Sequence, residues 1–476
     1  MDICRSIIGG KAAHSALPVI EKIYPATGEI IAHIEPASTK MLDEAVRIAQ
    51  VAQKSWAKTS PFDRAKILHR AADLMREANE DLARLEVLDV GKAFGEAISG
   101  DVPSGTDAFD YFAACITAQQ GDFDKWDGAI AYSNKEPLGV CAGIGAWNYP
   151  MQIACWKAAP ALAAGNAFIL KPSEQTPLVA HKVGELLAAA GLPNGLFQII
   201  HGDHIIGAAL CAHPGIAKIS LTGGVDTGRL IMTQSAQSLK KITLELGGKS
   251  PLIVFDDADF ELAVQTALAA NFYTAGEVCS NATRVFVQRS IAKEFIAALI
   301  VAAEAIKIGD PMAPDVQMGA LISAPHLAKV LDYVRKGSEG GATIATGGKQ
   351  IFPQGCENGY FMQPTIMTDC HDDMQIVREE IFGPVMSVLI FEDEDEAIRR
   401  ANNSDFGLGA GIMTRDLARA HRVADALEAG NIWVNSYNLL PPGLPFGGAK
   451  QSGFGRENGM ATLDAYSEVK SVYIQL

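Results

Sequence analysis

The chain has 476 residues, of which 48% are hydrophobic and 20% are charged, with 45 glycines. Because a single hydrophobic core stops growing at about 250 to 300 residues, this length predicts two large domains, and the composition excludes a disordered chain. The formal charge of −15 makes nucleic acid and anionic membrane surfaces poor partners. No basic segment followed by a long apolar run opens the sequence, so we expect a cytoplasmic protein without a membrane span.

Apolar residues recur at intervals of three and four from Thr39 to about Thr117, a spacing that predicts helices. From Gly139 onward, short apolar runs alternate with helical stretches, and this alternation predicts a parallel sheet covered on both faces. The expected strands are residues 140–144, 167–170, 197–200, 216–221 and 252–255. A second cycle begins after residues 244–249 and includes strands at 284–288, 385–391 and 431–435, which predicts a second α/β domain.

Residues 121–135 and 465–476 are extended and β-prone and fit no helix cycle. They predict either an arm that joins subunits or an ordinary edge hairpin.

The eight cysteines lack both the paired spacing of a zinc site and the density of a disulfide scaffold. The run Cys370-His371-Asp372 contains metal-ligating residue types, but adjacent side chains rarely point at one ion. We therefore predict a turn at this run.

Two loops follow predicted strands with residues suited to a nucleotide. Residues 220–229 close a strand and open a helix with three glycines, where N–H groups can receive a phosphate. A simple tight turn is an equally good interpretation, and Arg229 excludes a Walker loop. The second loop is Leu170-Lys171-Pro172-Ser173-Glu174. A carboxylate such as that of Glu174 accepts hydrogen bonds from ribose hydroxyls and repels a 2′-phosphate, which favours NAD over NADP. A surface ion pair between Lys171 and Glu174 is the alternative.

Three separated residues form a candidate catalytic set. Cys279 is flanked by small residues between a helical stretch and a strand, although a buried, inert thiol is the usual fate of a single cysteine. Asn148 offers an amide donor for an oxyanion, and Glu245 offers a base beside two glycines.

Six motifs make the chain resemble the aldehyde dehydrogenase superfamily from end to end, and within it the betaine aldehyde dehydrogenases most. These motifs are Ala146-Trp147-Asn148-Tyr149-Pro150, Lys171-Pro172-Ser173-Glu174, Leu244-Glu245-Leu246-Gly247-Gly248-Lys249, Gly276-Glu277-Val278-Cys279-Ser280-Asn281, Glu379-Glu380-Ile381-Phe382-Gly383-Pro384 and Pro445-Phe446-Gly447-Gly448.

The resemblance implies an aldehyde dehydrogenase-like α/β fold with two Rossmann-like, doubly wound domains and a β oligomerisation arm. Residues 1–120 and 138–247 would bind NAD, 248–461 would form the catalytic domain, and 121–137 with 462–476 would form the arm of a homodimer or homotetramer.

The resemblance also implies NAD-dependent oxidation of betaine aldehyde to glycine betaine. Cys279 would attack the aldehyde, Asn148 would hold the oxyanion, and Glu245 would activate the water that cleaves the thioester. Lys157 and Glu457 match a charge relay or an ion pair that only braces the site. The positions implied for NAD are Gly145, Ala146, Trp147, Lys171, Pro172, Ser173, Glu174, Gly202, Gly207, Gly223, Gly224, Thr227, Gly228, Glu380 and Phe382.

A quaternary ammonium substrate would want aromatic faces and acidic groups. Tyr149, Trp156, Glu277 and Tyr437 could supply them, although the two first-named aromatics could be helix core and Glu277 could face solvent. Tyr437 replaces a tryptophan of many betaine aldehyde enzymes, so 4-aminobutyraldehyde and 4-trimethylaminobutyraldehyde remain alternative substrates.

The resemblance further implies a potassium ion on backbone oxygens of Lys22, Ile23 and Asp89. His204 stands where many relatives have glycine and is expected to crowd or stack on the adenine. A catalytically silent NAD-binding protein and a coenzyme A-acylating enzyme are competing readings, which the intact Cys279 and Glu245 disfavour.

Overall fold

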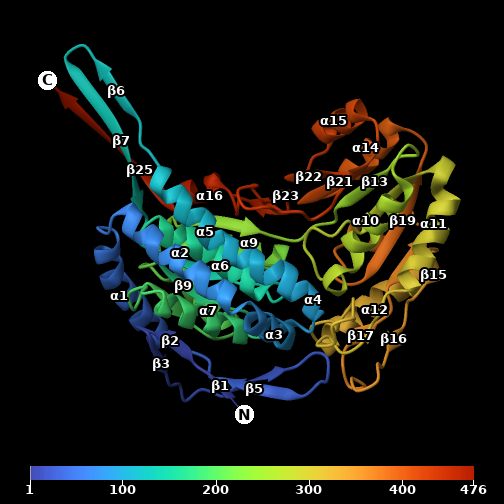
Figure 1. Ribbon diagram of the computed structural model, residues 1–476, viewed down its shortest axis with the longest axis horizontal. Helices are drawn as coiled ribbons and strands as arrows, with labels where there is room; N and C mark the ends of the chain where they lie inside the picture. The colour runs from blue at the N-terminus through green and yellow to red at the C-terminus, as the bar shows by residue number, and fades with distance from the viewer. Residues whose placement is uncertain (1) are drawn as a thin grey trace.

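The computed structural model describes residues 2–476 and shows two lobes, each built around one sheet (Figure 1). The first sheet has eight strands in the order β24-β12-β11-β8-β9-β10-β2-β3. Its strands are β2 (Ser6–Ile8), β3 (Lys11–Ala13), β8 (Val140–Ile144), β9 (Ala167–Lys171), β10 (Phe197–Ile199), β11 (Lys218–Thr222), β12 (Lys241–Glu245) and β24 (Gly453–Phe454). The five central strands are parallel, and antiparallel strands close both edges.

Helices cover both faces of this sheet. Helix α1 packs on β8 and β9 and contacts α8, while α6 packs on the same strands, with α2 and α5 outside it. The helices of this lobe are α1 (Thr39–Trp56), α2 (Pro61–Glu77), α3 (Asn79–Val90), α4 (Phe94–Glu96), α5 (Val102–Ala118), α6 (Pro150–Ala163), α7 (Leu178–Ala189), α8 (His204–Ala212) and α9 (Val225–Ser235). Nearly every residue of α6 is buried, as a helix that is apolar all round requires.

The second sheet has seven strands in the order β15-β18-β19-β14-β13-β21-β22. They are β13 (Pro251–Val254), β14 (Arg284–Gln288), β15 (Thr343–Thr346), β18 (Thr365–Thr368), β19 (Val385–Phe391), β21 (Gly409–Met413) and β22 (Asn431–Val434). Its helices are α10 (Phe260–Phe272), α11 (Arg289–Glu304), α12 (Ala324–Glu339), α13 (Gln375–Arg378), α14 (Glu394–Asn402), α15 (Leu417–Ala426) and α16 (Met460–Ala465), the last returning to the first lobe. All neighbours except β15 and β18 are parallel.

A three-stranded sheet projects from the first lobe and carries the C-terminus (Figure 1). It consists of β6 (Phe123–Trp126), β7 (Ala129–Pro137) and β25 (Ser467–Gln475), and β25 pairs with β7 along its whole length. The large apolar side chains of Phe123, Trp126, Val469 and Tyr473 are exposed on it. Trp126 and Tyr473 stack with ring centroids 6.1 Å apart.

A further three-stranded sheet lies at the N-terminus, where the sequence predicted no element. It is formed by β1 (Asp2–Cys4), β4 (Ile20–Ile23) and β5 (Ile30–Ile34) in the order β1-β5-β4. Two short antiparallel pairs complete the fold, β16 (Gln350–Ile351) with β17 (Phe361–Met362) and β20 (Phe406–Gly407) with β23 (Ala449–Lys450).

The predicted parallel sheets are confirmed, with two differences. The strand expected at 252–255 belongs to the second sheet rather than to the first. The segment Gly453–Phe454, 200 residues later in the chain, returns to pair with β12 in the first sheet, and its two residues carry no strand periodicity.

The run Cys370-His371-Asp372 follows strand β18 and leads into a turn at Asp372, as predicted, and Asp372 accepts hydrogen bonds from Arg400. Within residues 2–476 no group of three or more histidine, cysteine or acidic side chains could hold a metal ion. No helix in the described part of the chain is long and apolar enough to cross a membrane.

Candidate active site

Four loops that the sequence singled out lie at one edge of the first sheet. They follow β8, β9, β11 and β12, whose last residues are in register, since Ile144 pairs with Lys171 and Thr222 pairs with Glu245. The carboxyl ends of parallel strands share an edge, and such edges bind ligands. The tertiary fold therefore gathers segments from residues 145–248 into one site.

The nucleophile segment approaches this edge from the second lobe. After α10 the chain passes through Thr274 and Ala275, both with φ of 50°, and Gly276 with φ of 76°. A Cβ at Gly276 would collide with the carbonyl of Gly383. This tight backbone turn presents Cys279, which is half-buried.

The Cys279 thiol lies in a partly dry and acidic environment. Burial raises its pKa to about 12, with further upward contributions from Glu380 and Glu245, whereas the backbone N–H groups of Ser280 and Cys279 lower it. The resting thiol is therefore protonated at neutral pH, and a base must take its proton before attack.

Asn148 lies directly against the nucleophile segment. Its Nδ2 donates to the carbonyl oxygen of Glu277, 2.9 Å away, and its side chain is buried. One amide hydrogen is thus fixed by the protein, which orients the group two residues from Cys279. The pairing of Asn148 with the cysteine segment joins residues more than a hundred positions apart.

Glu245 is the last residue of β12, and neither of its carboxylate oxygens has a hydrogen-bond partner in the described structure. Burial raises its pKa well above the usual range, Glu457 raises it further, and Lys157 and Arg456 lower it. A Cβ at Gly447 would lie 2.7 Å from Oε1 of Glu245. Gly447 thus leaves room for the buried carboxyl group. A general base needs an oxygen that is free to accept a hydrogen bond from water, and Glu245 meets this requirement.

Lys157 and Glu457 form a buried ion pair behind Glu245. The Lys157 ammonium donates to Glu457 and also to the Ser220 hydroxyl 3.0 Å away, which itself donates to Glu457 at 3.2 Å. Ser220 lies on β11, and sequence reasoning missed its place in this cluster. Lys157 lies on α6, Ser220 on β11 and Glu457 in the loop between β24 and α16. The ion pair therefore also holds this loop against the first lobe.

The loop after β9 holds Lys171 and Glu174 together. The Lys171 ammonium lies 3.4 Å from Glu174 and donates to the Pro172 carbonyl. A Cβ at Gly207 would lie 3.9 Å from the Lys171 side chain, which places α8 beside the loop. The His204 imidazole, by contrast, is 90% exposed and extends into solvent.

Helix α9 begins without a side-chain cap. Gly224 occupies its N-cap position, so the first N–H groups of an eleven-residue helix have no side-chain acceptor. Gly228 packs closely on Leu246, since a Cβ there would lie 2.8 Å from the leucine side chain. The helix start can therefore receive an anion while the helix stays tight against the loop after β12.

Glu380 and Phe382 reach the same edge from the second lobe. Glu380 accepts from the Gly248 N–H at 3.0 Å, and burial raises its pKa to about 7. Phe382 has φ of 63° and meets Trp147 edge to face, with centroids 5.2 Å apart. His326, which sequence reasoning missed, bonds the Phe382 carbonyl through Nε2 at 2.6 Å and so supports this backbone.

Tyr149 and Trp156, two of the four residues proposed to contact the substrate, are hydrogen-bonded to the protein through their polar atoms. The Tyr149 hydroxyl pairs with Thr274 at 3.0 Å, and the Lys92 ammonium lies 3.7 Å from the centre of its ring. Trp156 donates to the Ser104 carbonyl and meets Phe446 edge to face at 5.9 Å. Phe446 stands in the Pro445–Gly448 motif, and its aromatic character was the signal that could have identified it.

Glu277 and Tyr437, the other two residues proposed to contact the substrate, are hydrogen-bonded to backbone groups of the protein. Glu277 is fully buried, not facing solvent, and accepts from the Ile322 N–H at 3.0 Å. The Tyr437 hydroxyl donates to the Ser280 carbonyl at 2.7 Å, and its ring packs on Trp433. These hydrogen bonds fix Glu277 and Ser280, which lie on either side of Cys279 in the chain.

The backbone positions expected to bind potassium do not fit a metal ion. The Lys22 ammonium itself donates to the carbonyl oxygens of Ile23 and Asp89, each 2.7 Å away. The lysine side chain therefore occupies the place that the ion would need.

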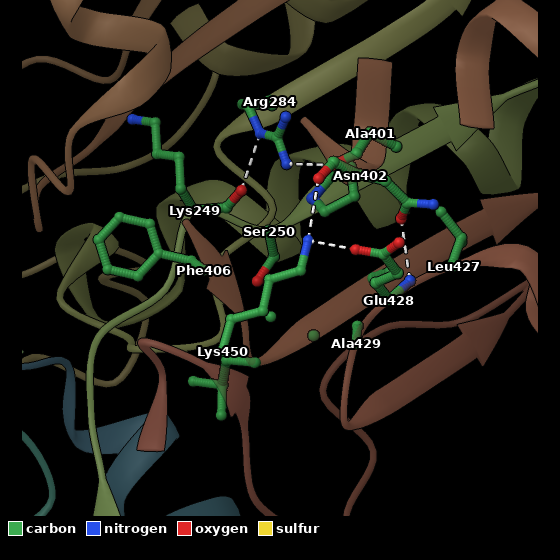
Figure 2. A pocket seen from close by; sticks show the side chains of 15 residues that line it. Lys249, Ser250, Arg284, Ala401, Asn402, Phe406, Leu427, Glu428, Ala429 and Lys450 are labelled. Carbon is green, nitrogen blue, oxygen red and sulfur yellow. Dashed lines mark hydrogen bonds and ion pairs between the residues drawn. The ribbon is translucent and has the colours of Figure 1, made fainter. Parts of the chain in front are cut away.

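A recess near Lys249 is drawn in Figure 2, and none of Cys279, Asn148 and Glu245 lines it. Hydrogen bonds of Arg284 and Lys450 cross it, and its free volume is about 10 Å³, room for about one water molecule. The Lys249 side chain points away from it (Figure 2). The recess cannot hold an organic substrate.

Comparison with known proteins gives consistent matches along the chain. The model of the aldehyde dehydrogenase family matches residues 12–472. Betaine aldehyde dehydrogenase of Rhizobium etli (strain CIAT 652) is 55% identical over 458 residues, which cover 96% of this chain and 94% of that protein. Betaine aldehyde dehydrogenase 1 of Rhizobium meliloti (strain 1021) is 54% identical over 470 residues, 98% of this chain and 96% of that protein.

Solved structures match equally well. An aldehyde dehydrogenase from Bacillus cereus in complex with NAD+ is 40% identical, with a TM-score of 0.97, and the match covers 100% of this chain and 97% of that one. Betaine aldehyde dehydrogenase from Staphylococcus aureus in complex with NAD+ is 39% identical, with a TM-score of 0.96 and coverage of 99% and 95%.

Proposed function

Because this chain belongs to the aldehyde dehydrogenase family, we propose that it oxidises betaine aldehyde to glycine betaine with NAD, through a thioester on Cys279. The observation that carries the proposal is the buried Glu245 side chain, whose two carboxyl oxygens have no hydrogen-bond partner in the described structure and which is one of the groups that raise the pKa of the Cys279 thiol. The curated relatives named betaine aldehyde dehydrogenase, 54 to 55% identical over nearly the whole chain, support the choice of substrate.

The reaction begins when the Cys279 thiol passes its proton to solvent water and the resulting thiolate sulfur bonds to the aldehyde carbon. The carbonyl oxygen becomes an oxyanion, which accepts hydrogen bonds from Asn148 Nδ2 and the Cys279 backbone N–H. NAD, when bound, supplies the hydride acceptor, so the carbon is oxidised and a thioester remains on sulfur. Glu245 then takes a proton from water as the water oxygen bonds to the thioester carbon, and the acid leaves as the carbon–sulfur bond breaks.

The cofactor would lie along the carboxyl edge of the first sheet. Lys171 and Glu174 would bind the adenosine ribose, the uncapped start of α9 would receive the pyrophosphate, and Glu380 with Phe382 would hold the nicotinamide ribose. The residues present fit a dinucleotide, because a cation, a carboxylate and an open helix start follow neighbouring strands. The His204 side chain is exposed at the start of α8, where it would be free to stack on the adenine. Potassium is not part of the proposal, since Lys22 bonds two of the expected oxygens.

The cationic head of the substrate would lie against Trp156 and Phe446. These rings are buried and meet edge to face, and an aromatic face attracts a quaternary ammonium by about 0.5 to 2 kcal/mol. Because Lys92 already lies on one face of Tyr149, this tyrosine has only its other face to offer. An aminoaldehyde such as 4-aminobutyraldehyde or 4-trimethylaminobutyraldehyde is the second candidate, since the same rings suit both heads.

The test is NADH formation with betaine aldehyde, 4-aminobutyraldehyde, 4-trimethylaminobutyraldehyde and propanal, measured for the wild type and for Cys279→Ala. We expect the highest kcat/KM with betaine aldehyde and no activity in the variant. Another preferred aldehyde would overturn the substrate, and full activity of Cys279→Ala would overturn the mechanism.

We also propose the domain division and assembly that the resemblance implies. Residues 1–120 and 138–247 would form the NAD-binding domain and 248–461 the catalytic domain, a division supported by the two sheets, with β24 as the exception. The exposed rings of Trp126 and Tyr473 support an oligomerisation arm of a homodimer or homotetramer. We further propose the cytoplasmic location that the sequence predicts, supported by the scattered spacing of the cysteines, which lack the density of a disulfide scaffold.

A further inference from the structure

One buried ammonium in the first lobe bonds to backbone carbonyls. Lys22 lies on β4, its residue exposure is 1%, and its Nζ donates to the carbonyl oxygens of Ile23 and Asp89 at 2.7 Å each. The two oxygens come from different elements, an edge strand and the end of α3. Lys22 therefore joins the N-terminal sheet to the helical layer through its charge.

Both carbonyls lie where regular structure leaves such groups without a partner. Asp89 is in the last turn of α3, and the last carbonyls of a helix have no intrahelical donor and carry the negative end of its dipole. The pairing of β4 with β5 shifts register between Lys22 and Ile23, and such a bulge leaves a residue out of the ladder. The two oxygens form a small site that calls for a cation.

The same turn also holds the start of α7. The Asp89 carboxylate accepts from the Leu178 and Val179 N–H groups at 3.2 and 2.9 Å. Helix α7 follows the loop of Lys171 and Glu174, so the cation position lies behind the loop proposed to bind the adenosine ribose. Burial lowers the pKa of Lys22 to about 8, while the neighbouring Asp89 and Cys4 raise it.

We propose that the Lys22 ammonium is the built-in monovalent cation of this fold, so that the protein neither binds nor requires potassium at this position. An ammonium and a potassium ion carry the same charge and are both satisfied by carbonyl oxygens. A tethered ammonium, unlike a free ion, is present at every salt concentration. The proposal concerns the folded first lobe and does not depend on the substrate or on the catalytic mechanism.

The test is thermal unfolding of the full-length protein in KCl, NaCl and Tris chloride at equal ionic strength. For the wild type we expect the same Tm in all three salts. For Lys22→Gly, which removes the ammonium and leaves space beside the carbonyls, we expect a Tm several degrees lower in Tris chloride and a recovery in KCl that NaCl does not match. Lys22→Met is the matched control, because its side chain fills the space without a charge, and its lowered Tm should not respond to potassium.

Two results would overturn the proposal. One is a wild-type Tm several degrees higher in KCl than in Tris chloride, because an intact lysine should leave no room for the ion. The other is a Lys22→Gly variant whose Tm is the same in every salt. If this variant is recovered only as unfolded chain, its refolding yield is measured in the same salts, and a yield that rises with potassium alone supports the proposal whereas equal yields refute it.

Discussion

Replacement of Glu245 by glutamine separates the two halves of the proposed reaction. The substitution keeps the size of the side chain but removes the base, and because neither carboxylate oxygen has a partner no hydrogen bond of the fold is lost. Thioester formation should continue, while hydrolysis should become slow. NADH should therefore appear as a rapid burst close to the concentration of active sites, followed by a slow steady rate.

The size of the effect follows from the role of a general base. Such a group contributes about 10²- to 10⁴-fold, which corresponds to about 3 to 5 kcal/mol of activation free energy. Burial raises the pKa of Glu245 well above its usual range, so its basic form increases as the pH rises. Wild-type thioester hydrolysis should accelerate with pH for this reason, and the variant should lose that dependence on Glu245.

The assay is stopped-flow absorbance of NADH with excess aldehyde and NAD, joined to mass spectrometry of the intact protein to detect the acyl group on Cys279. Glu304→Gln, the same chemical change on the exposed face of α11, is the control and should behave as the wild type. A steady-state rate of Glu245→Gln within about threefold of wild type, far below the loss expected for a general base, would refute the reasoning. So would a slow rate with no burst, because that result would place Glu245 before thioester formation.

Three further predictions concern single groups of the site. Lys157→Met should lower the free energy of unfolding by about 3 to 5 kcal/mol, because it leaves the Glu457 carboxylate buried without its cation; denaturant titration would contradict this with a loss under about 1 kcal/mol. Phe446→Leu should raise KM for betaine aldehyde by about 2- to 30-fold and leave KM for propanal nearly unchanged, since only the cationic head loses an aromatic face; equal changes for both substrates would exclude that role. Because burial raises the pKa of Cys279 to about 12, its alkylation by iodoacetamide in the absence of cofactor should be slow at neutral pH and rise about tenfold per pH unit toward that value. A rate that is already constant from pH 7 would show instead a preformed thiolate.

Short-range patterns in the sequence specified most of the secondary structure. The strands at 140–144, 284–288 and 385–391 were predicted with the bounds that the structure has, because buried parallel strands are continuous apolar runs between turns. The short strands β1 and β4 were missed, since three or four residues give too little periodicity to separate a strand from a loop. The pairing of β24 with β12 was missed because the two strands lie about 200 residues apart in the chain, and local sequence patterns do not indicate such a distant partner.

The chemical inventory of the site was also present in the sequence. The order of the motifs that contain Asn148, Glu245 and Cys279 was enough to show the resemblance to aldehyde dehydrogenases. Each reacting group must be a particular residue type, and glycines are needed where the backbone comes close to it. Gly447 illustrates this requirement, since any side chain there would meet the Glu245 carboxylate.

Only the tertiary structure decided which groups face the ligand and which serve the scaffold. Glu277 and Tyr437 were expected to face a cationic substrate, whereas the structure shows their polar atoms bonded to Ile322 and Ser280. The family resemblance implied a potassium ion on backbone oxygens of Lys22, Ile23 and Asp89, whereas the fold shows the Lys22 ammonium bonded to the carbonyl oxygens of the other two. The physical reason is common to these cases: residue type fixes what a side chain can donate or accept, but the partner is set by long-range packing, which local sequence does not encode.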